Sequence, residues 1–360
     1  MLTNFLSTFQ ILSTAFFSLF FLSACEKEKA TVSTNPPQNL NGIFIINEGS
    51  YGSGNGSISF ISNDSTYYNN DLYNTINNSA LGDIVQSMTI YNNFAYIPVN
   101  NSQRMEVVSM TDFKRKGSIT GLSSPRFFVG NGSTGFVSDW VSNSVYVINL
   151  NSLTITDTIY CGAGPEGMTI VNNKLFICNS GGFSDDSTVT VADAITHELI
   201  TTIHTPVNPT SVMVDANGMV RVLCKGSLGS DYTPTTDDAP GALISIDPST
   251  FGITQTLYFN YDEHPVKMQI SAEKQNLFYL KGSYGYGGTI NKIAINASNL
   301  PLSSFINSEF YGLGINPKNG DIYGGRVNFS ANTYAIRFNE AGLVQDSVLA
   351  GIGPNGFVFN

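Results

Sequence analysis

One phrase recurs along the chain and constrains its fold more than any other feature. A start residue, usually proline, is followed by two short apolar runs with a turn between them. The phrase starts at Ser87, Pro125, Pro165, Pro209, Pro265, Tyr311 and Pro354. Successive starts lie 38, 40, 44, 56, 46 and 43 residues apart. A four-stranded propeller blade takes about 40–45 residues, so this spacing predicts a β-propeller.

Each repeat divides into four short strands rich in Val, Ile, Phe, Tyr and Thr, separated by Gly, Asn and Pro turns. In the repeat that starts at Pro165 we expect the strands at 167–171, 174–179, 187–193 and 198–204. The last repeat has a single strand at 356–359, whereas 43–46 resembles a second strand that lacks its first. Pairing these two ends would close an all-β, seven-bladed β-propeller over residues 42–360 and would leave no long unpaired edge. The alternative is two packed domains of about 160 residues each, but neither half shows a boundary of its own.

The amino terminus predicts export and lipidation. Residues 1–24 carry no charged side chain, and the run from Ile11 to Leu22 is almost wholly apolar. That run is shorter than the roughly 20 residues of a membrane span but suits the core of a signal peptide. It is followed by Leu-Ser-Ala-Cys, which resembles a bacterial lipobox and predicts acylation of Cys25, although no Lys or Arg precedes the core. Residues 25–41 would then form a flexible tether, and a plain secretory signal is the alternative.

The composition excludes one class of partner and limits cysteine chemistry. The net charge is −10 and the pI is about 4.7, whereas nucleic-acid binding requires clustered Lys and Arg. Three further cysteines, Cys161, Cys178 and Cys224, allow at most one disulfide and form no Cys-x-x-Cys pair. Buried thiols that pack as small apolar side chains are the favoured interpretation.

The repeats resemble a known type of protein. Val145-Tyr-Val-Ile-Asn-Leu and Ala242-Leu-Ile-Ser-Ile-Asp-Pro-Ser-Thr resemble YncE-type, or surface-layer-type, propeller repeats. The segment from Ile43 to Phe60, with its Asn-Glu-Gly motif, looks like the start of a family of Bacteroidetes lipoproteins. Some members capture cobalamin at the cell surface and pass it to a TonB-dependent outer-membrane transporter. The resemblance therefore implies an outer-membrane, lipid-anchored protein that binds a small molecule and hands it over without turnover. The cell surface is the expected location, and the periplasmic face is the alternative.

The predicted binding residues lie on loops that a propeller gathers on one face. These loops follow the second strand of each repeat or connect one repeat to the next. The expected ligand-binding residues are Glu48, Tyr51, Asn100, Arg126, Asp139, Trp140, Glu166, Phe183, Lys225, Tyr232, His264, Lys281, Tyr284, Tyr286, Arg326 and Phe329. Rigid aromatic side chains bury a large area at low entropic cost, and a few charges then orient the ligand. We expect a macrocycle such as cobalamin or a related corrinoid to suit this set, whereas aromatic packing between loops is the alternative.

Two other functions use the same fold. A propeller hydrolase or lactonase would hold a metal ion with Glu, Asn and Asp side chains in the channel, which Glu48 and Asn100 could partly supply. An envelope protein that binds other proteins would instead show a flat polar face. The sequence contains no Gly-x-Ser-x-Gly motif and no convincing catalytic or metal-ligand set. We therefore predict a binding protein with no catalytic residues, no metal and no cofactor.

Overall fold

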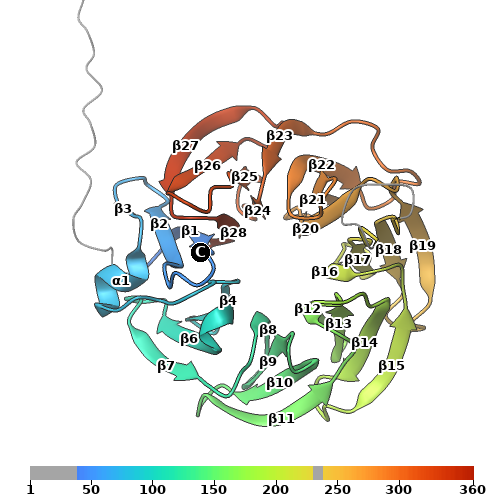
Figure 1. Ribbon diagram of the computed structural model, residues 1–360, viewed down its shortest axis with the longest axis horizontal. Coiled ribbons are helices and arrows are strands. Elements are labelled where there is room, and N and C mark those ends of the chain that lie inside the picture. Colours follow the sequence, from blue (N-terminus) through green and yellow to red (C-terminus); the bar gives the residue numbers. More distant parts are fainter. Residues whose placement is uncertain (1–38, 230–237) are drawn as a thin grey trace, which may run out of the picture. The chain divides into compact units, whose positions relative to one another are not determined.

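The strands form a ring of sheets around a central channel (Figure 1). The computed structural model describes residues 39–229 and 238–360. Within each four-stranded sheet the strands lie in sequence order, with the first strand next to the channel and the last at the outer edge. The protein is thus an all-β propeller, as the repeat predicted.

Five sheets have four strands each. The first contains β4 (Thr89–Tyr91), β5 (Phe94–Val99), β6 (Arg104–Ser109) and β7 (Arg115–Ile119). The second contains β8 (Pro125–Asn131), β9 (Thr134–Asp139), β10 (Ser144–Asn149) and β11 (Thr154–Tyr160). The third contains β12 (Pro165–Val171), β13 (Lys174–Asn179), β14 (Thr188–Asp193) and β15 (Leu199–His204). The fourth contains β16 (Pro209–Val214), β17 (Val220–Cys224), β18 (Ala242–Ile246) and β19 (Ile253–Tyr258). The fifth contains β20 (His264–Ile270), β21 (Asn276–Gly282), β22 (Gly288–Ala294) and β23 (Ile306–Phe310).

The sixth sheet has eight strands and contains the carboxyl terminus. Its strands are β24 (Gly312–Ile315), β25 (Ile322–Gly325), β26 (Thr333–Phe338), β27 (Val344–Ala350), β28 (Pro354–Phe359), β1 (Gly42–Asn47), β2 (Ser57–Ser62) and β3 (Tyr68–Asn69). β28 pairs antiparallel with β1 along most of its length, so the predicted closure by the two ends is confirmed. A short helix, α1 (Leu72–Asn77), and a 3-10 turn at Asn100–Ser102 were not predicted.

The predicted count of seven separate blades is corrected here. The described residues form five separate four-stranded blades and one continuous eight-stranded sheet. The two halves of that sheet join through one parallel residue pair, Leu313 with Gly356. The backbones approach closely because Gly312 and Gly325 lack side chains: a Cβ at either position would lie 2.4 or 2.2 Å from the carbonyl oxygen of Pro354.

The hydrophobic core lies between the faces of neighbouring sheets. In one such layer Phe176, Cys178 and Val189 from the third sheet pack against Val222 and Cys224 from the fourth. Both thiols are fully buried, and the three described cysteines are free, as the sequence interpretation expected. None of the helices within residues 39–229 and 238–360 has the length and apolar character needed to cross a membrane.

Four of the innermost strands share a β-bulge near their start, and this detail positions the channel side chains. The pairing register with the second strand shifts between Pro125 and Phe128 in β8, Pro165 and Met168 in β12, Pro209 and Ser211 in β16, and Val266 and Gln269 in β20. Proline is tolerated at this channel-facing edge because no strand pairs there, so its missing N–H removes no hydrogen bond from the sheet. A bulge leaves residues unpaired and redirects their side chains.

Candidate functional site

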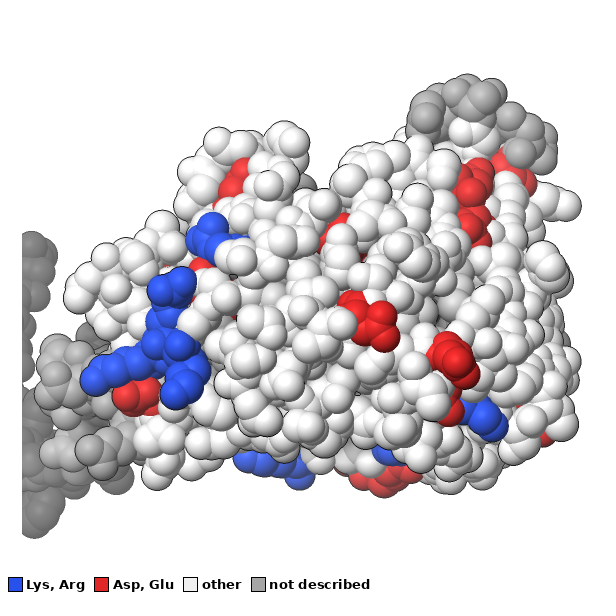
Figure 2. All heavy atoms as spheres, turned by 90° about the horizontal axis from the view of Figure 1, so that it is seen from below, with Lys and Arg blue, Asp and Glu red and all other residues white. Residues whose placement is uncertain are grey.

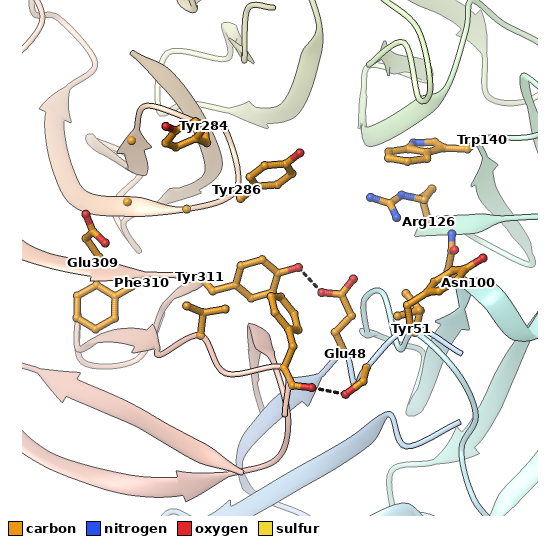
Figure 3. Close-up of a pocket in the computed structure, with 18 of the residues that line it drawn as sticks. Glu48, Tyr51, Asn100, Arg126, Trp140, Tyr284, Tyr286, Glu309, Phe310 and Tyr311 are labelled. Atoms are coloured by element: carbon orange, nitrogen blue, oxygen red, sulfur yellow. Dashed lines mark hydrogen bonds between the residues drawn. The ribbon is translucent and has the colours of Figure 1, made fainter. Parts of the chain in front are cut away.

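A wide cavity opens between loops from several sheets (Figure 3). Its volume is about 970 Å³, at the upper end of the roughly 300–1,000 Å³ found for small-molecule pockets. Nine of the predicted ligand-binding residues line it: Glu48, Tyr51, Asn100, Arg126, Trp140, Phe183, Tyr284, Tyr286 and Phe329. The structure thus brings together most of the predicted rim, while the ligand role of these residues stays a prediction.

Aromatic side chains dominate the walls of this cavity. Tyr51, Phe183 and Tyr286 are 81%, 88% and 71% exposed, which is unusual for residues of this size. Phe183 meets Trp140 edge to face, with ring centroids 5.7 Å apart. Tyr284 and Tyr286 lie across the cavity from Trp140 (Figure 3). These rings present large apolar faces to solvent that a ligand could cover.

Arg126 is the most firmly held charged residue of the cavity. It comes from the bulge in β8, and its guanidinium lies 3.8 Å from the centre of the Trp140 ring. Its Nε and Nη2 donate to the two carboxylate oxygens of Glu166 at 2.9 and 2.7 Å, and Nη1 donates to Gln86 at 2.5 Å. Trp140 Nε1 also donates to Glu166. A bidentate pair of this kind fixes orientation as well as charge, so this platform is rigid before any ligand arrives.

A second fixed contact crosses the cavity between Glu48 and Tyr311. Glu48 follows β1, and Tyr311 lies in the connection between β23 and β24. The Tyr311 hydroxyl donates to the Glu48 carboxylate (Figure 3). Burial, together with the nearby negative charge of Glu48, raises the pKa of Tyr311 well above its ordinary value, so the phenol stays protonated. The backbone N–H of Glu48 donates to Gly353 at 2.9 Å, which ties this side of the cavity to the closing strand.

A smaller cavity of about 200 Å³ adjoins the first and shares Glu48, Arg126, Trp140, Tyr286 and Tyr311 with it. Two more predicted residues, Glu166 and Lys225, line this smaller cavity. Lys267, from the bulge in β20, lines it as well. Three basic and two acidic side chains therefore line this cavity, whereas Figure 2 shows one group of Lys and Arg and several separate Asp and Glu residues among uncharged ones on the outer side.

Asp139 and His264, two of the predicted ligand-binding residues, are buried and lie outside both cavities. Asp139 is fully buried and accepts hydrogen bonds from the backbone N–H groups of Ser123 and Ser124, both at 2.8 Å. His264 is 1% exposed, and its ring nitrogens contact the carbonyl oxygen of Lys225 at 3.1 Å and Asp238 at 3.3 Å. Both side chains stabilise loops from within.

Lys281 and Arg326 also lie outside the two cavities that hold the other predicted residues. Lys281 forms an ion pair with Glu263. Arg326 is exposed, donates to the carbonyl oxygen of Glu309 at 3.0 Å and lies over the ring of Phe310. The last two predicted positions, Tyr232 and the lipidation site Cys25, lie outside the described residues.

Sequence reasoning missed several lining residues, of which Tyr311 and Lys267 matter most. Tyr311 had been recognised only as the start of a repeat without proline, and Lys267 follows the repeat start Pro265 by two residues. The signal was available, because residues just after a repeat start occupy the bulge that faces the channel. Across residues 39–229 and 238–360, no three His, Cys, Asp or Glu side chains come together in a way that could hold a metal ion.

Comparison with protein families gives one match, to the family described as "Domain of unknown function (DUF5074)", over residues 41–341. Among curated protein sequences no significant match was found.

Many solved structures resemble the propeller. A proposed 6-phosphogluconolactonase from Bacteroides fragilis is 11% identical, with a TM-score of 0.64 over 91% of this chain and 100% of that one. A second proposed 6-phosphogluconolactonase, from Bacteroides uniformis, is 12% identical, with a TM-score of 0.60 over 90% and 100%. Hydrazine synthase from Kuenenia stuttgartiensis is 13% identical, with a TM-score of 0.59 over 77% and 92%. At these identities the likeness shows the fold alone.

Proposed function

We propose a function for this chain, which belongs to the DUF5074 family. It captures a bulky small molecule in the cavity of about 970 Å³, called the aromatic cavity below, and releases it unchanged. The observation that carries this proposal is the cavity of about 970 Å³ with exposed aromatic walls over a rigid polar floor. Aromatic faces supply contact area, whereas the fixed Arg126 and Glu48 supply direction.

Preorganisation supports binding as the role of this cavity. Arg126 is held by Glu166, Gln86 and Trp140, and Glu48 is held by Tyr311. Because these groups are already ordered, a ligand would not have to immobilise them, and that cost would not weaken its affinity. No described residue forms a hydrogen bond with the side chains of Tyr51, Tyr284 and Tyr286, so these rings can adjust to the ligand.

Cobalamin or a related corrinoid is the specific ligand that we propose. The support is the resemblance of residues 43–60 to the cobalamin-capturing propeller lipoproteins, together with a cavity large enough for a macrocycle. Lipidation at Cys25, an outer-membrane location and transfer to a TonB-dependent transporter belong to the same proposal.

Calorimetric titration with cyanocobalamin tests the proposal. Replacing Tyr284 and Tyr286 together by alanine should weaken binding at least tenfold, because each aromatic contact contributes about 0.5–1.5 kcal/mol beyond the area that it buries. The matched control replaces Tyr160 and Tyr258, which are 79% and 61% exposed on the outer strands β11 and β19. Equal affinities for the two double variants would remove the aromatic cavity from ligand binding.

The alternative enzyme is a propeller hydrolase, with Glu48 and Asn100 at its centre. The carboxylate of Glu48 already accepts the Tyr311 hydroxyl, and the Asn100 amide donates to Ser124 at 2.8 Å. Turnover of a lactone that is lost in Glu48→Gln, combined with no response to cyanocobalamin at micromolar concentration, would favour the hydrolase over the binding protein.

A further inference from the structure

Two lysines in the channel are not explained by the aromatic cavity. Lys225 follows β17, and Lys267 lies in the bulge of β20; both line the 200 Å³ cavity. Lys267 also lines a third cavity of about 260 Å³, together with Gln86 and Ser211. Lys267 therefore stands where the two smaller cavities meet.

The backbone of Lys267 is held in an unusual conformation. Its φ angle is 58°, in the left-handed region that residues other than glycine seldom adopt. Such a conformation costs on the order of 1–3 kcal/mol and persists only where the surrounding structure imposes it. Here the bulge between Val266 and Gln269 imposes it and leaves the lysine side chain in the channel.

Neither lysine forms an ion pair within the described residues, although Glu166 and Asp185 attract Lys225 and Glu48 and Glu166 attract Lys267. The carboxylate of Glu166 is taken by Arg126 and Trp140, and that of Glu48 accepts the Tyr311 hydroxyl. No described residue makes an ion pair or a hydrogen bond with either ammonium group, and the Lys267 ammonium lies 5.4 Å from the centre of the Tyr311 ring.

The charges that line the 200 Å³ cavity do not balance. Three cations, Arg126, Lys225 and Lys267, face two carboxylates, Glu48 and Glu166. Burial lowers the pKa of both lysines, which reflects the cost of keeping an unpaired ammonium group away from bulk water. An anion between the two ammonium groups would offset that cost.

We propose that Lys225 and Lys267 hold a small oxyanion, a phosphate or carboxylate group, in the channel next to the aromatic cavity. Ser211 lines the same cavity, and its hydroxyl accepts from the backbone N–H of Met268, so its own proton is available to donate to such a group. The cavity of about 200 Å³ is large enough for one oxyanion together with water molecules, each of which takes about 30 Å³. The anion has two possible sources: a free inorganic ion, or an anionic arm of the molecule held in the aromatic cavity. The second source rests on the proposed function.

The experiment compares wild-type protein with Lys267→Met and Lys225→Met by calorimetry at constant ionic strength. Inorganic phosphate is the first probe, and cyanocobalamin, which carries a phosphodiester, is the second. Lys318→Met is the matched control, because this exposed lysine lies outside the channel cavities. Lys267→Arg keeps the positive charge. The thermal unfolding of Lys267→Arg and Lys267→Met is compared with that of the wild type to check that both variants fold.

Two results support the proposal and separate the sources. Phosphate binding that falls at least tenfold in both methionine variants, but not in Lys318→Met, indicates a free anion. In the second result, neither the wild type nor any variant binds phosphate, but Lys267→Met reduces the affinity for cyanocobalamin at least tenfold and Lys267→Arg restores it. This result indicates that the anion is a group of the captured ligand. Unchanged affinity for both probes in the two channel variants would overturn the proposal. The titration with phosphate does not involve a corrinoid. It can therefore be interpreted even if the protein does not bind cyanocobalamin.

Discussion

The ion pair between Arg126 and Glu166 offers the sharpest test of how the channel is stabilised. The two side chains are 13% and 10% exposed and share two hydrogen bonds of 2.7 and 2.9 Å. Replacing Arg126 by methionine removes the cation and leaves a largely buried carboxylate. Breaking a buried pair in this way typically costs about 3–5 kcal/mol of unfolding free energy. We expect about 3 kcal/mol, because Lys225 still attracts Glu166.

A double-mutant cycle separates this charge effect from lost packing. Changing Arg126→Met together with Glu166→Gln removes both charges, while the glutamine oxygen can still accept from Trp140. The double variant should therefore lose less stability than the two single variants combined, with a coupling energy of at least about 2 kcal/mol. Urea unfolding followed by circular dichroism measures this coupling without relying on the fluorescence of Trp140, which lies within the perturbed site.

The surface pair of Arg337 with Asp346 serves as the control. These side chains are 38% and 55% exposed, and solvent screens their attraction. Arg337→Met should cost less than about 1 kcal/mol. If Arg126→Met cost no more than Arg337→Met, the channel would be better solvated than its burial indicates and the reasoning above would fail.

Two further predictions concern buried groups away from the mouth of the cavity. Burial raises the pKa of Cys161 to about 12 from 9.0, which implies about 1000-fold less thiolate near pH 8. Iodoacetamide should therefore label the fully buried Cys178 and Cys224 only after unfolding and the partly exposed Cys161 slowly in the native protein, and fast native labelling detected by peptide mapping would contradict this. At Gly164, with φ of 59°, a Cβ would lie 2.2 Å from the backbone nitrogen of Gly182. Gly164→Ala should lower the thermal midpoint by several degrees, whereas an unchanged midpoint would mean that these two loops move apart freely.

Much of the strand pattern could be predicted because each strand carries its own local signal. The strand expected at 174–179 is found as β13 with the same bounds, and the preceding Asn172 and Asn173 both adopt the positive φ of a tight hairpin turn. The pairing of the two chain ends followed from counting strands per repeat. Local turn chemistry and repeat length thus suffice for the ring.

Contacts between neighbouring repeats could not be predicted in the same way. The junction that makes one eight-stranded sheet depends on a single parallel pair and on Gly312 and Gly325, whose missing side chains let two backbones meet. A glycine in a strand is compatible with a bulge, a bend or a close approach, and only the tertiary structure decides among them. The buried state of His264 has the same origin, because Asp238 lies 26 residues away in a different connection.

The channel side chains show where sequence reasoning stopped too early. The repeat start had been used to count blades, yet the same proline marks the edge where each bulge forms. In β8 and β12 the next residue, Arg126 or Glu166, faces the channel, and in β20 the bulge lies one residue later and presents Lys267. These three bulge residues therefore supply three of the five charged side chains that line the 200 Å³ cavity, and Glu48 and Lys225 from the loops supply the other two. The tyrosine-bearing loops can vary to fit a ligand while the bulged residues keep the floor rigid, which is the division of roles that a capture protein requires.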